Sequence, residues 1–524
     1  MSLKPEDGRT LELGVKSAGL ASFVSLARLI YILAGGIMLI VVARWLGPSQ
    51  YGIYTLAIAI TGFGTAFGSI NIGPYFNKYI PKLISEKRFD RIGIFIGDGI
   101  VFLLILTICI MVLGDIFAGP IAQSVFGSQS YTFIVYLSML GIIGAIVYPI
   151  LTTILVSLGT GVEIAVSSSS ALVIQTAISI ALVLLGFGAV GVIEAYVASV
   201  FLGTVITLYL IHRHAAMRFV VKGFRQRLGH ILRFSLPLTS SGLIFGSISN
   251  FLIIYMALLL IPTSVIGQYG IATKASTMFD VAIGSISVVL VPMFATALYN
   301  RHGIRKISRL YQNSIYYSFL FTVPLIVYAT VLSYDIIVTV FTASYNLAVI
   351  YMPMVVFGVF LSLLWNNAFF LLVSLGRVKR LMKFAIIGGF SEFIAVLILG
   401  YLFGIIGIIV GGFYIVNIVL IWLYFTELKR LRIVVDFSPS LRVLLSNLVL
   451  GAIMIPLVFL PIRPLYVLFI GMALVILVYP VLLVKLKAMR KDDIGVLYKV
   501  SREIPLGAVL RAVIRYGERF LANG

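Results

Sequence analysis

Long apolar segments fill most of the chain, and short polar stretches separate them. A helix needs about 20 apolar residues to cross a membrane, and about fourteen segments of this kind follow one another along the sequence. They lie near residues 19–43, 51–71, 93–118, 131–157, 164–187, 189–211, 235–260, 265–297, 312–334, 346–373, 381–402, 404–426, 441–460 and 464–485. This pattern predicts an all-α polytopic membrane protein.

Composition supports this class and excludes a soluble protein. Hydrophobic residues make up 61% of the chain and charged residues 11%, whereas a soluble domain has about 25% charged residues. Residues 1–17 are polar and the first apolar segment lacks a clear cleavage site, so no cleavable signal peptide is expected. The single cysteine, Cys109, excludes an intramolecular disulfide framework and a thiolate metal cluster.

The net charge of +21 is concentrated in alternate loops. Basic groups occupy residues 78–91, 213–233, 301–309, 377–383 and 429–442, whereas the loops at 114–131 and 334–346 contain no Lys or Arg. Because cytoplasmic loops are enriched in Lys and Arg, this alternation predicts that both termini are cytoplasmic. It also predicts attraction to anionic lipid headgroups. No nucleic-acid partner is expected, because the basic groups follow the alternation of loops and form no platform with interleaved aromatic residues.

The two halves of the chain repeat short motifs at a spacing of about 217 positions. Gln50-Tyr51-Gly52-Ile53 returns as Gln268-Tyr269-Gly270-Ile271, Pro74 and Phe76 as Pro292 and Phe294, Leu155–Gly159 as Leu372–Gly376, and Phe187-Gly188 with Gly191 as Phe403-Gly404 with Gly407. Four matches in one order indicate a duplicated transporter. Each half has an even number of predicted spans, so the halves are expected to be parallel repeats.

The repeats and loops define the expected domains. They are a cytoplasmic N-terminus at 1–17, a six-helix bundle at 18–212, a cytoplasmic linker at 213–233, a second six-helix bundle at 234–428, two further spans at 429–486 and a cytoplasmic tail at 487–524. Within the linker, Met217, Val220, Val221 and Phe224 have helical spacing, which predicts an amphipathic helix at the membrane surface.

Charged residues within the spans are the first candidates for function, because burying a charge in hydrocarbon costs at least about 2.5–3.5 kcal/mol. Arg28 lies near the middle of the first predicted span and Lys274 near the middle of the eighth. Each lies on a helix that begins its half or adjoins the first helix of that half, so both side chains are candidates to face a cleft between the halves. The alternative is an internal ion pair, for which Asp280, Glu392 and Glu194 are available partners.

Acidic and amide side chains within the spans supply further candidates. Burial would raise the pKa of the Glu392 carboxyl, which makes Glu392 a candidate proton or cation site. Asp280 and Glu194 are further candidates for this role. The alternative for Glu392 is a structural hydrogen bond. Trp365, Asn366 and Asn367 place polar groups at mid-membrane, where they either join helices or contact a polar ligand. The serines at 167–170 either line a wet cavity or let helices approach closely.

Several motifs resemble one membrane-transporter family. The segment ARWLGPSQYGIY, which follows a span containing Arg28, resembles the opening of the lipid-linked oligosaccharide (O-antigen and exopolysaccharide) flippases. These belong to the MOP superfamily, together with MATE multidrug exporters and peptidoglycan-precursor flippases. The segments GQYGIATKASTMF and LLVSLGRVK resemble the matching parts of the second half. The resemblance covers about residues 11–486.

The resemblance implies a MATE-like fold, in which two six-helix bundles surround a V-shaped central cavity and two further helices follow. It implies movement of a polyprenyl-(pyro)phosphate-linked oligosaccharide to the outer leaflet by alternating access. Cavity Arg and Lys residues of the family hold the phosphate, a role that Arg28 and Lys274 match by position. Expected partners are this substrate, membrane lipid and glycan polymerases or glycosyltransferases; no cofactor is expected, and Na⁺ or H⁺ are candidates for coupling.

Alternative functions differ in the charges that they require. A MATE-type Na⁺- or H⁺-coupled multidrug antiporter for cations would need a negatively charged cavity. A membrane-embedded glycan polymerase or transferase would need convergent acids or bases in an outer loop, and the short outer loops argue against it. The sequence has no nucleotide-binding motif and no metal-ligand spacing, so a non-enzymatic transporter without a bound metal is expected.

Overall fold

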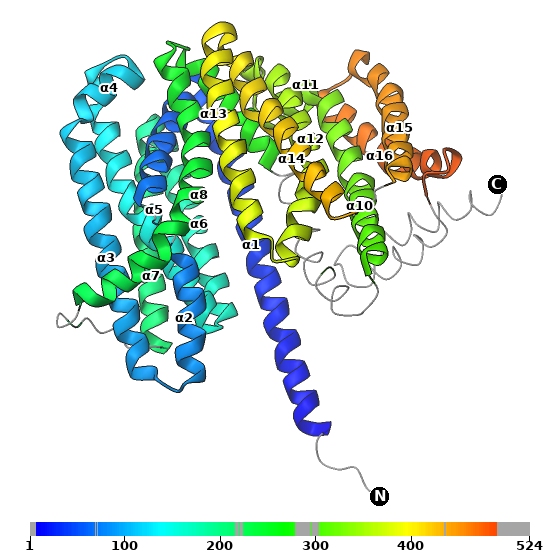
Figure 1. Ribbon diagram of the computed structural model, residues 1–524. Coiled ribbons are helices and arrows are strands. Elements are labelled where there is room, and N and C mark those ends of the chain that lie inside the picture. Colours follow the sequence, from blue (N-terminus) through cyan, green and yellow to red (C-terminus); the bar gives the residue numbers. More distant parts are fainter. Residues whose placement is uncertain are drawn as a thin grey trace, which may run out of the picture. The chain divides into compact units, whose positions relative to one another are not determined.

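The computed structural model describes the backbone of residues 7–68, 70, 72–214, 220, 224–277, 294, 303–433 and 436–489. Every regular element within these ranges is a helix (Figure 1). Ten helices in this part of the chain are long and apolar enough to cross a membrane. The predicted all-α polytopic fold is therefore confirmed. The total of about fourteen spans stays a prediction, because the expected span at 265–297 extends beyond the described residues.

The chain divides by its internal contacts into two compact units, residues 1–267 and 268–524. The first contains α1 (Asp7–Gly68), α2 (Gly73–Ser85), α3 (Phe89–Ile116), α4 (Ala118–Phe126), α5 (Thr132–Leu158), α6 (Gly161–Leu184), α7 (Gly188–His214) and α8 (Phe224–Leu258). The second contains α10 (Gly303–Val331), α11 (Ser333–Ile336), α12 (Ala348–Ser374), α13 (Val378–Ile409), α14 (Val416–Arg430), α15 (Ser438–Met454) and α16 (Pro464–Lys485). A further helix covers residues 263–277. The domain boundaries expected from the sequence stay predictions.

Glycines divide the longest helices where the sequence places two spans in succession. Gly47 adopts φ 66° and ψ 175°, and Pro48 follows it, so α1 is two helical segments with a break between them. Gly404 adopts φ 59° and ψ −135°, a conformation that only glycine reaches easily, and it breaks α13. Both breaks lie between spans that the sequence predicts as separate.

Local geometry recurs at the spacing of the sequence repeat. Gly188 and Gly404 share a φ of 59°. An added Cβ at Gly191 would lie 2.8 Å from the Cβ of Leu182, and one at Gly407 would lie 1.8 Å from the carbonyl oxygen of Leu399. The connection between α6 and α7 and the break in α13 therefore both require a small residue three positions after the glycine of positive φ.

The ends of α5 and α12 also match. Gly159 and Gly376 have positive φ, and each donates a backbone hydrogen bond of 3.0 Å to the carbonyl three residues earlier. These glycines close the two helices by the same left-handed cap. The duplication read from the sequence therefore has a counterpart in the backbone.

The basic segment at 78–91 differs from the expectation. The sequence predicts a loop here, but Lys78 and Lys82 lie on α2, so the prediction is wrong for this part; Lys87 and Arg88 lie in the connection between α2 and α3, as predicted. Pro74 opens this helix, and Tyr75, Phe76 and Ile80 bury one of its faces. The segment forms a helix because it is amphipathic: its apolar face packs against other helices, while its lysines are exposed.

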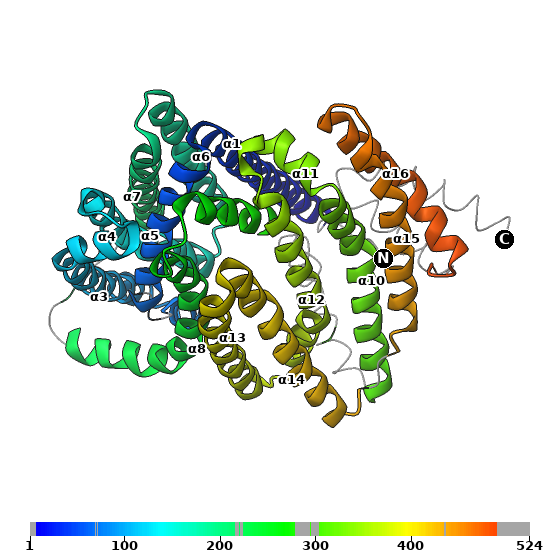
Figure 2. The same cartoon turned by 90° about the horizontal axis from the view of Figure 1, so that it is seen from above.

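Helix α5 lies within the first unit, with α1, α3 and α7 around it (Figure 2). Its contact with α1 depends on two glycines: an added Cβ at Gly64 or Gly68 would lie 2.3 Å from Ile142 or Ile146. The small-residue face therefore serves helix packing. In the second unit, α12 packs against α10, α13 and α14, while α15 packs against α10 and α16.

Candidate functional site

The first unit contains a cavity of about 680 Å³ between α1, α5, α6 and α7, all of which are membrane-spanning. Hydroxyl, amide and aromatic groups interrupt its apolar walls. They come from Tyr31, Tyr148, Thr152, Thr153, Ser168, Ser169, Gln175, Tyr196 and Ser199. No Asp or Glu is among its described lining residues. The cavity therefore offers neutral hydrogen-bond donors and acceptors within otherwise apolar helices.

Hydrogen bonds of α6 hold the walls of this cavity in place. Ser167 is fully buried and shares a hydrogen bond of 2.6 Å with Thr207 of α7. Its carbonyl accepts a bond of 3.1 Å from the Tyr148 hydroxyl of α5. Ser169 donates a bond of 2.7 Å to the carbonyl of Ala27 on α1. The serine run thus has both roles considered from the sequence: Ser167 joins helices, and Ser169 also lines the cavity.

Of the two predicted phosphate-binding cations, only Lys274 has a described side chain. It is exposed on the helix at 263–277, whose neighbouring residues Ala275 and Ser276 are buried. Arg28 lies on α1, but its side chain lies outside the described residues, as does Asp280. The shared cavity of Arg28 and Lys274 stays a prediction, as does the alternative of an internal ion pair.

Two of the predicted polar contacts join helices in the second unit. The Trp365 indole donates a hydrogen bond of 2.6 Å to Oδ1 of Asn417, and its ring stacks on Tyr424 at 5.5 Å between centroids. Asn367 is buried and donates a bond of 3.2 Å to the Ser318 hydroxyl. Asn366 is half-buried. Trp365 and Asn367 therefore form hydrogen bonds between helices, which is one of the two roles expected from the sequence. That Trp365, Asn366 or Asn367 contacts a ligand stays a prediction.

The candidate coupling carboxylates differ in burial. Glu392 on α13 is 7% exposed and lies within electrostatic range of Tyr269, which is 3% exposed. Glu194 on α7 is half-buried and does not line the cavity of the first unit. Among the described residues, no group of three or more His, Cys, Asp or Glu is arranged to hold a metal ion.

The sequence did not single out the aromatic groups of the cavity. Tyr31, Tyr148 and Tyr196 belong to three helices, and nothing in their spacing links them. One signal was available, because Tyr148 occupies the position in the first half that Trp365 has in the second. A polar aromatic residue at the same depth of both halves marks a place where a hydrogen bond is needed within the bundle.

Comparison with known proteins shows the family of this chain. Residues 20–298, more than half of the chain, match the family described as "Polysaccharide biosynthesis protein". No curated protein matches the chain by sequence. Solved structures match its fold over most of both chains.

One such structure is a lipid II flippase, MurJ, in an inward closed conformation, with a TM-score of 0.70 and 16% identity, covering 88% of this chain and 97% of the other. A second is an inward-facing multidrug resistance MATE transporter of the MOP superfamily, with a TM-score of 0.56 and 18% identity, covering 77% and 95%. A third is the Vibrio cholerae MATE transporter VcmN in its bent form, with a TM-score of 0.51 and 15% identity, covering 80% and 100%. The fold expected from the sequence, MATE-like, is confirmed.

Proposed function

Because the chain belongs to the polysaccharide biosynthesis protein family, we propose that it is a flippase for lipid-linked oligosaccharides. It moves a polyprenyl-phosphate or polyprenyl-diphosphate sugar from the cytoplasmic to the outer leaflet by alternating access. The observation that carries this proposal is the cavity of about 680 Å³ within the membrane-spanning helices of the first unit. Its neutral hydroxyls, amide and rings suit a sugar head.

A sugar presents hydroxyl groups around its ring and apolar C–H groups on its faces. Hydrogen bonds to the sugar hydroxyl groups can come from the Tyr148 and Ser168 hydroxyls and the Gln175 amide. The apolar faces of the sugar can pack on the rings of Tyr31 and Tyr196. Replacement of the hydration shell by such groups lowers the free-energy barrier for moving the head through hydrocarbon. The polyprenyl tail stays in lipid throughout.

Arg28 and Lys274 are proposed to hold the phosphate linker. Position 28 precedes Tyr31 by three residues, a spacing that places two positions on one face of a helix. Arg binds phosphate through two parallel hydrogen bonds, whereas Lys acts as a compact point charge. A phosphate would offset the free-energy cost of both cations in the loaded state, and water would do so in the empty state.

Multidrug antiport is the second candidate, because MATE transporters are among the matched structures. A carrier of organic cations needs a negatively charged cavity, and the described lining of the first unit carries no carboxylate. This disfavours an organic cation, and the hydroxyl, amide and ring groups of the lining favour a sugar-bearing substrate. The fold is that of transporters, and we propose that the protein catalyses no covalent reaction.

Coupling and location complete the proposal. Glu392 is the first candidate for Na⁺ or H⁺ coupling, with Asp280 and Glu194 as further candidates, because a buried carboxylate changes its charge or binds a cation when the transporter changes state. We propose that the protein lies in the cell membrane with both termini in the cytoplasm, because its basic loops alternate with loops that contain no Lys or Arg. Glycan polymerases and glycosyltransferases are the proposed partners.

The cavity variant that tests this function is Gln175→Leu in proteoliposomes containing a lipid-linked oligosaccharide. A membrane-impermeant glycosidase measures how fast the head changes leaflet. Loss of a hydrogen bond of about 1 kcal/mol slows translocation roughly fivefold. Val173→Leu, on the same helix but outside the cavity lining, is the matched control and keeps the wild-type rate. Equal rates for Gln175→Leu and wild type would remove the cavity from the transport path.

A further inference from the structure

A second cavity, of about 600 Å³, lies in the first unit between α2, α3 and the first turns of α8. One of its walls is aromatic. The rings of Tyr75 and Phe95 stack at 4.8 Å between centroids with an interplanar angle of 19°, and the Tyr79 ring lies 5.5 Å from that of His230. None of these residues lines the sugar-sized cavity described above.

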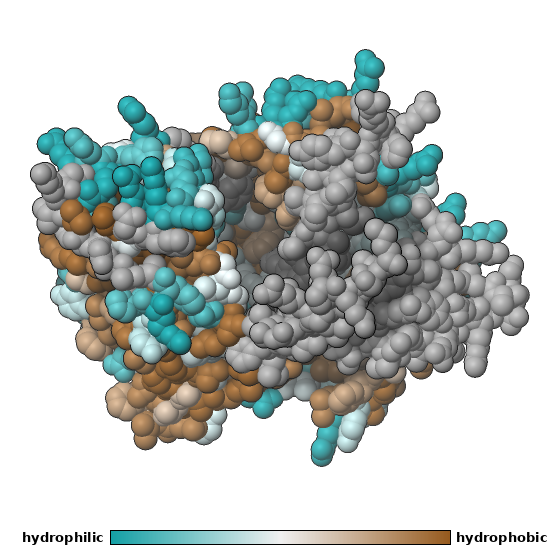
Figure 3. Space-filling view, turned by 90° about the horizontal axis from the view of Figure 1, so that it is seen from below, coloured by the Kyte–Doolittle hydropathy of each residue, from teal (hydrophilic) through white to brown (hydrophobic). Residues whose placement is uncertain are grey.

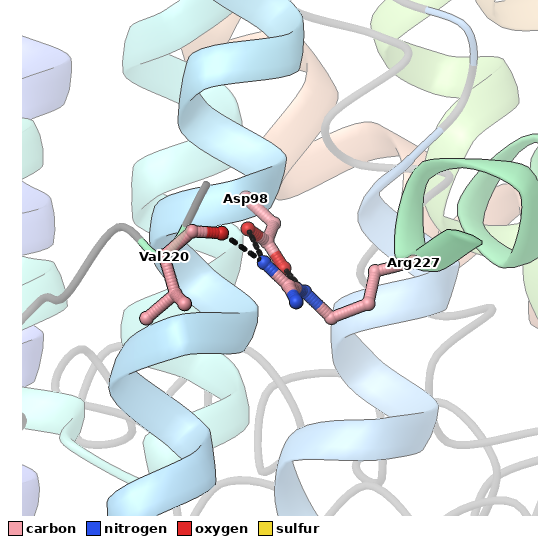
Figure 4. Close-up of polar contacts among 3 residues, drawn as sticks. All are labelled: Asp98, Val220 and Arg227. Carbon is pink, nitrogen blue, oxygen red and sulfur yellow. Dashed lines mark hydrogen bonds and ion pairs between the residues drawn. The ribbon is translucent and has the colours of Figure 1, made fainter. Parts of the chain in front are cut away.

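An ion pair between two lining residues of this cavity joins α3 to α8. Asp98 of α3 is 2% exposed and accepts two hydrogen bonds from the Arg227 guanidinium, one of them from Nη2 at 3.0 Å (Figure 4). Arg227 also donates to the carbonyl of Val220. The hydrogen bonds and charge of Asp98 raise the pKa of Arg227 above its ordinary value, so this pair stays charged and occupied. The Asp98–Arg227 pair forms part of the cavity wall, but its two charges neutralise each other and neither is available to a ligand.

The remaining charges of the wall are mostly positive. Lys82, Arg88 and Arg91 line the cavity, and Glu86 is the carboxylate that faces them. Glu86 lies 3.8 Å from Lys82 and 3.5 Å from Arg88, so one negative charge is shared between two cations. Arg91 takes part in none of the ion pairs formed by the described residues. The lining thus has a surplus of positive charge, and the Arg91 guanidinium has no ion-pair partner among the described residues, which suits a phosphate.

The surroundings of the cavity favour a lipid over a soluble phosphate. Figure 3 shows hydrophilic residues gathered on the lower face of the first unit, at the end where α2 and α3 are joined. Lys78 lies beside the cavity with its ammonium 4.9 Å from the centre of the Phe234 ring, a cation–π contact between α2 and α8. Cations at the helix ends next to aromatic rings and apolar helix surface are arranged as a membrane interface requires, with phosphate at the cations and acyl chains along the helices.

We propose that this cavity binds the phosphate headgroup of an anionic membrane lipid. Arg88 and Arg91 bind the phosphate, and Tyr79 and Phe95 contact the glycerol and upper acyl region. A bound lipid touches α2, α3 and α8 together, so it stabilises the packing of the first turns of α8 against α2 and α3. The proposal does not depend on which substrate the protein transports.

Native mass spectrometry of the full-length protein in detergent tests this site directly. Phosphatidylglycerol, phosphatidylcholine and inorganic phosphate are titrated separately into the delipidated wild type and the Arg88→Gln, Arg91→Gln double variant. Arg225→Gln, Arg233→Gln is the matched control, because it removes the same charge from exposed positions of α8 that do not line the cavity. The melting temperature of each variant shows that it is folded.

The expected result is a loss of at least tenfold in affinity for phosphatidylglycerol in the cavity variant and no change in the control. Phosphatidylcholine binds more weakly than phosphatidylglycerol to the wild type. Equal affinity of the cavity variant and the wild type would overturn the proposal, as would an equal loss in the control variant, which would indicate general attraction to a basic surface. If inorganic phosphate alone binds as tightly as the lipid and displaces it, the occupant is a soluble phosphate and the lipid assignment is wrong.

Discussion

Glu163 and Arg380 occupy equivalent positions at the starts of α6 and α13, and each contacts a side chain in the last turn of α7 or α14, respectively. Glu163 lies 2.9 Å from His214 at the end of α7. Arg380 lies 3.6 Å from Glu427 near the end of α14, and Arg377 and Arg430 approach the same carboxylate. The duplicated halves therefore keep a polar contact between the same two helices, although the carboxylate lies on the first helix in one half and on the second helix in the other.

Removal of the Glu427 carboxylate is predicted to destabilise the second unit. Glu427 is 2% exposed and is the shared partner of three guanidiniums, so Glu427→Gln leaves them without a counter-charge. The arginines are 41–61% exposed and partly hydrated, so we expect a loss of about 1–2 kcal/mol rather than the full cost of a buried pair. Thermal unfolding in detergent measures it. Glu163→Gln, which removes a half-buried pair to a histidine, is expected to cost less at pH 7.5.

A close backbone approach makes Gly52 sensitive to substitution. A Cβ at this position would lie 1.8 Å from the carbonyl oxygen of Thr263, and one at Gly267 would lie 2.0 Å from that of Pro48. Because backbone atoms cannot move aside cheaply, Gly52→Ala should lower the melting temperature by several degrees, roughly 4 °C or more. Gly36→Ala in the same helix meets nothing within 4 Å and serves as the control. Equal melting temperatures for the two variants would show that this approach is not part of the folded protein.

Asp335 is predicted to make stability depend on pH. Its side chain is 4% exposed, and Oδ2 has no hydrogen-bond partner among the described residues. Burial raises the pKa of this carboxyl above its ordinary value. The folded state therefore holds the proton more tightly than the unfolded state, and stability is lost as the pH rises through the folded-state pKa.

Asp335→Asn removes this dependence. The variant should melt roughly 2 °C or more above the wild type at pH 7.5, and the difference should shrink on acidification, where both carry a neutral group. Differential scanning fluorimetry at several pH values measures both. A variant that melts below the wild type at pH 7.5 would mean that the carboxylate has a stabilising partner.

The sequence predicts the architecture well because hydrophobic length and the breaking residues are local properties. The break at Gly47 follows from the Gly47-Pro48 pair, and the predicted span at 464–485 coincides with α16. The sequence predicts contacts between side chains poorly, because the partner of a residue can lie anywhere in the chain. Asp98 and Arg227 are 129 positions apart, and no local pattern links them.

Candidate site residues show the same division. Depth in a span marks Glu392 as buried before any contact is known, and the structure agrees. The different roles of Ser167 and Ser169, however, depend on which face of α6 meets α7, which only packing decides. The cluster of basic residues predicts a loop at Lys78 and Lys82, whereas the apolar face that makes α2 a helix depends on the burial of Tyr75 and Ile80 by other helices.

Loss of the proposed phosphate-binding cations should stop transport without unfolding the protein. Arg28→Lys is expected to retain partial translocation, because it keeps the charge and loses the two-pronged geometry. If Arg28 or Lys274 instead formed an internal ion pair, its removal would strand a buried carboxylate at a cost of about 3–5 kcal/mol. The single variants would then be unstable, and removing Asp280 or Glu392 would rescue them. Melting temperatures measured beside transport separate these two cases.

The most direct test of the central claim is translocation of a lipid-linked oligosaccharide by the Arg28→Ala, Lys274→Ala double variant in proteoliposomes, read by the accessibility of the sugar head to an impermeant glycosidase. The wild type should move the head between leaflets, and a double variant with an unchanged melting temperature should not. Normal translocation by the stable double variant would contradict the assignment of these cations. A wild type that moves no lipid-linked oligosaccharide but exports an organic cation against a Na⁺ or H⁺ gradient would contradict the proposed function itself.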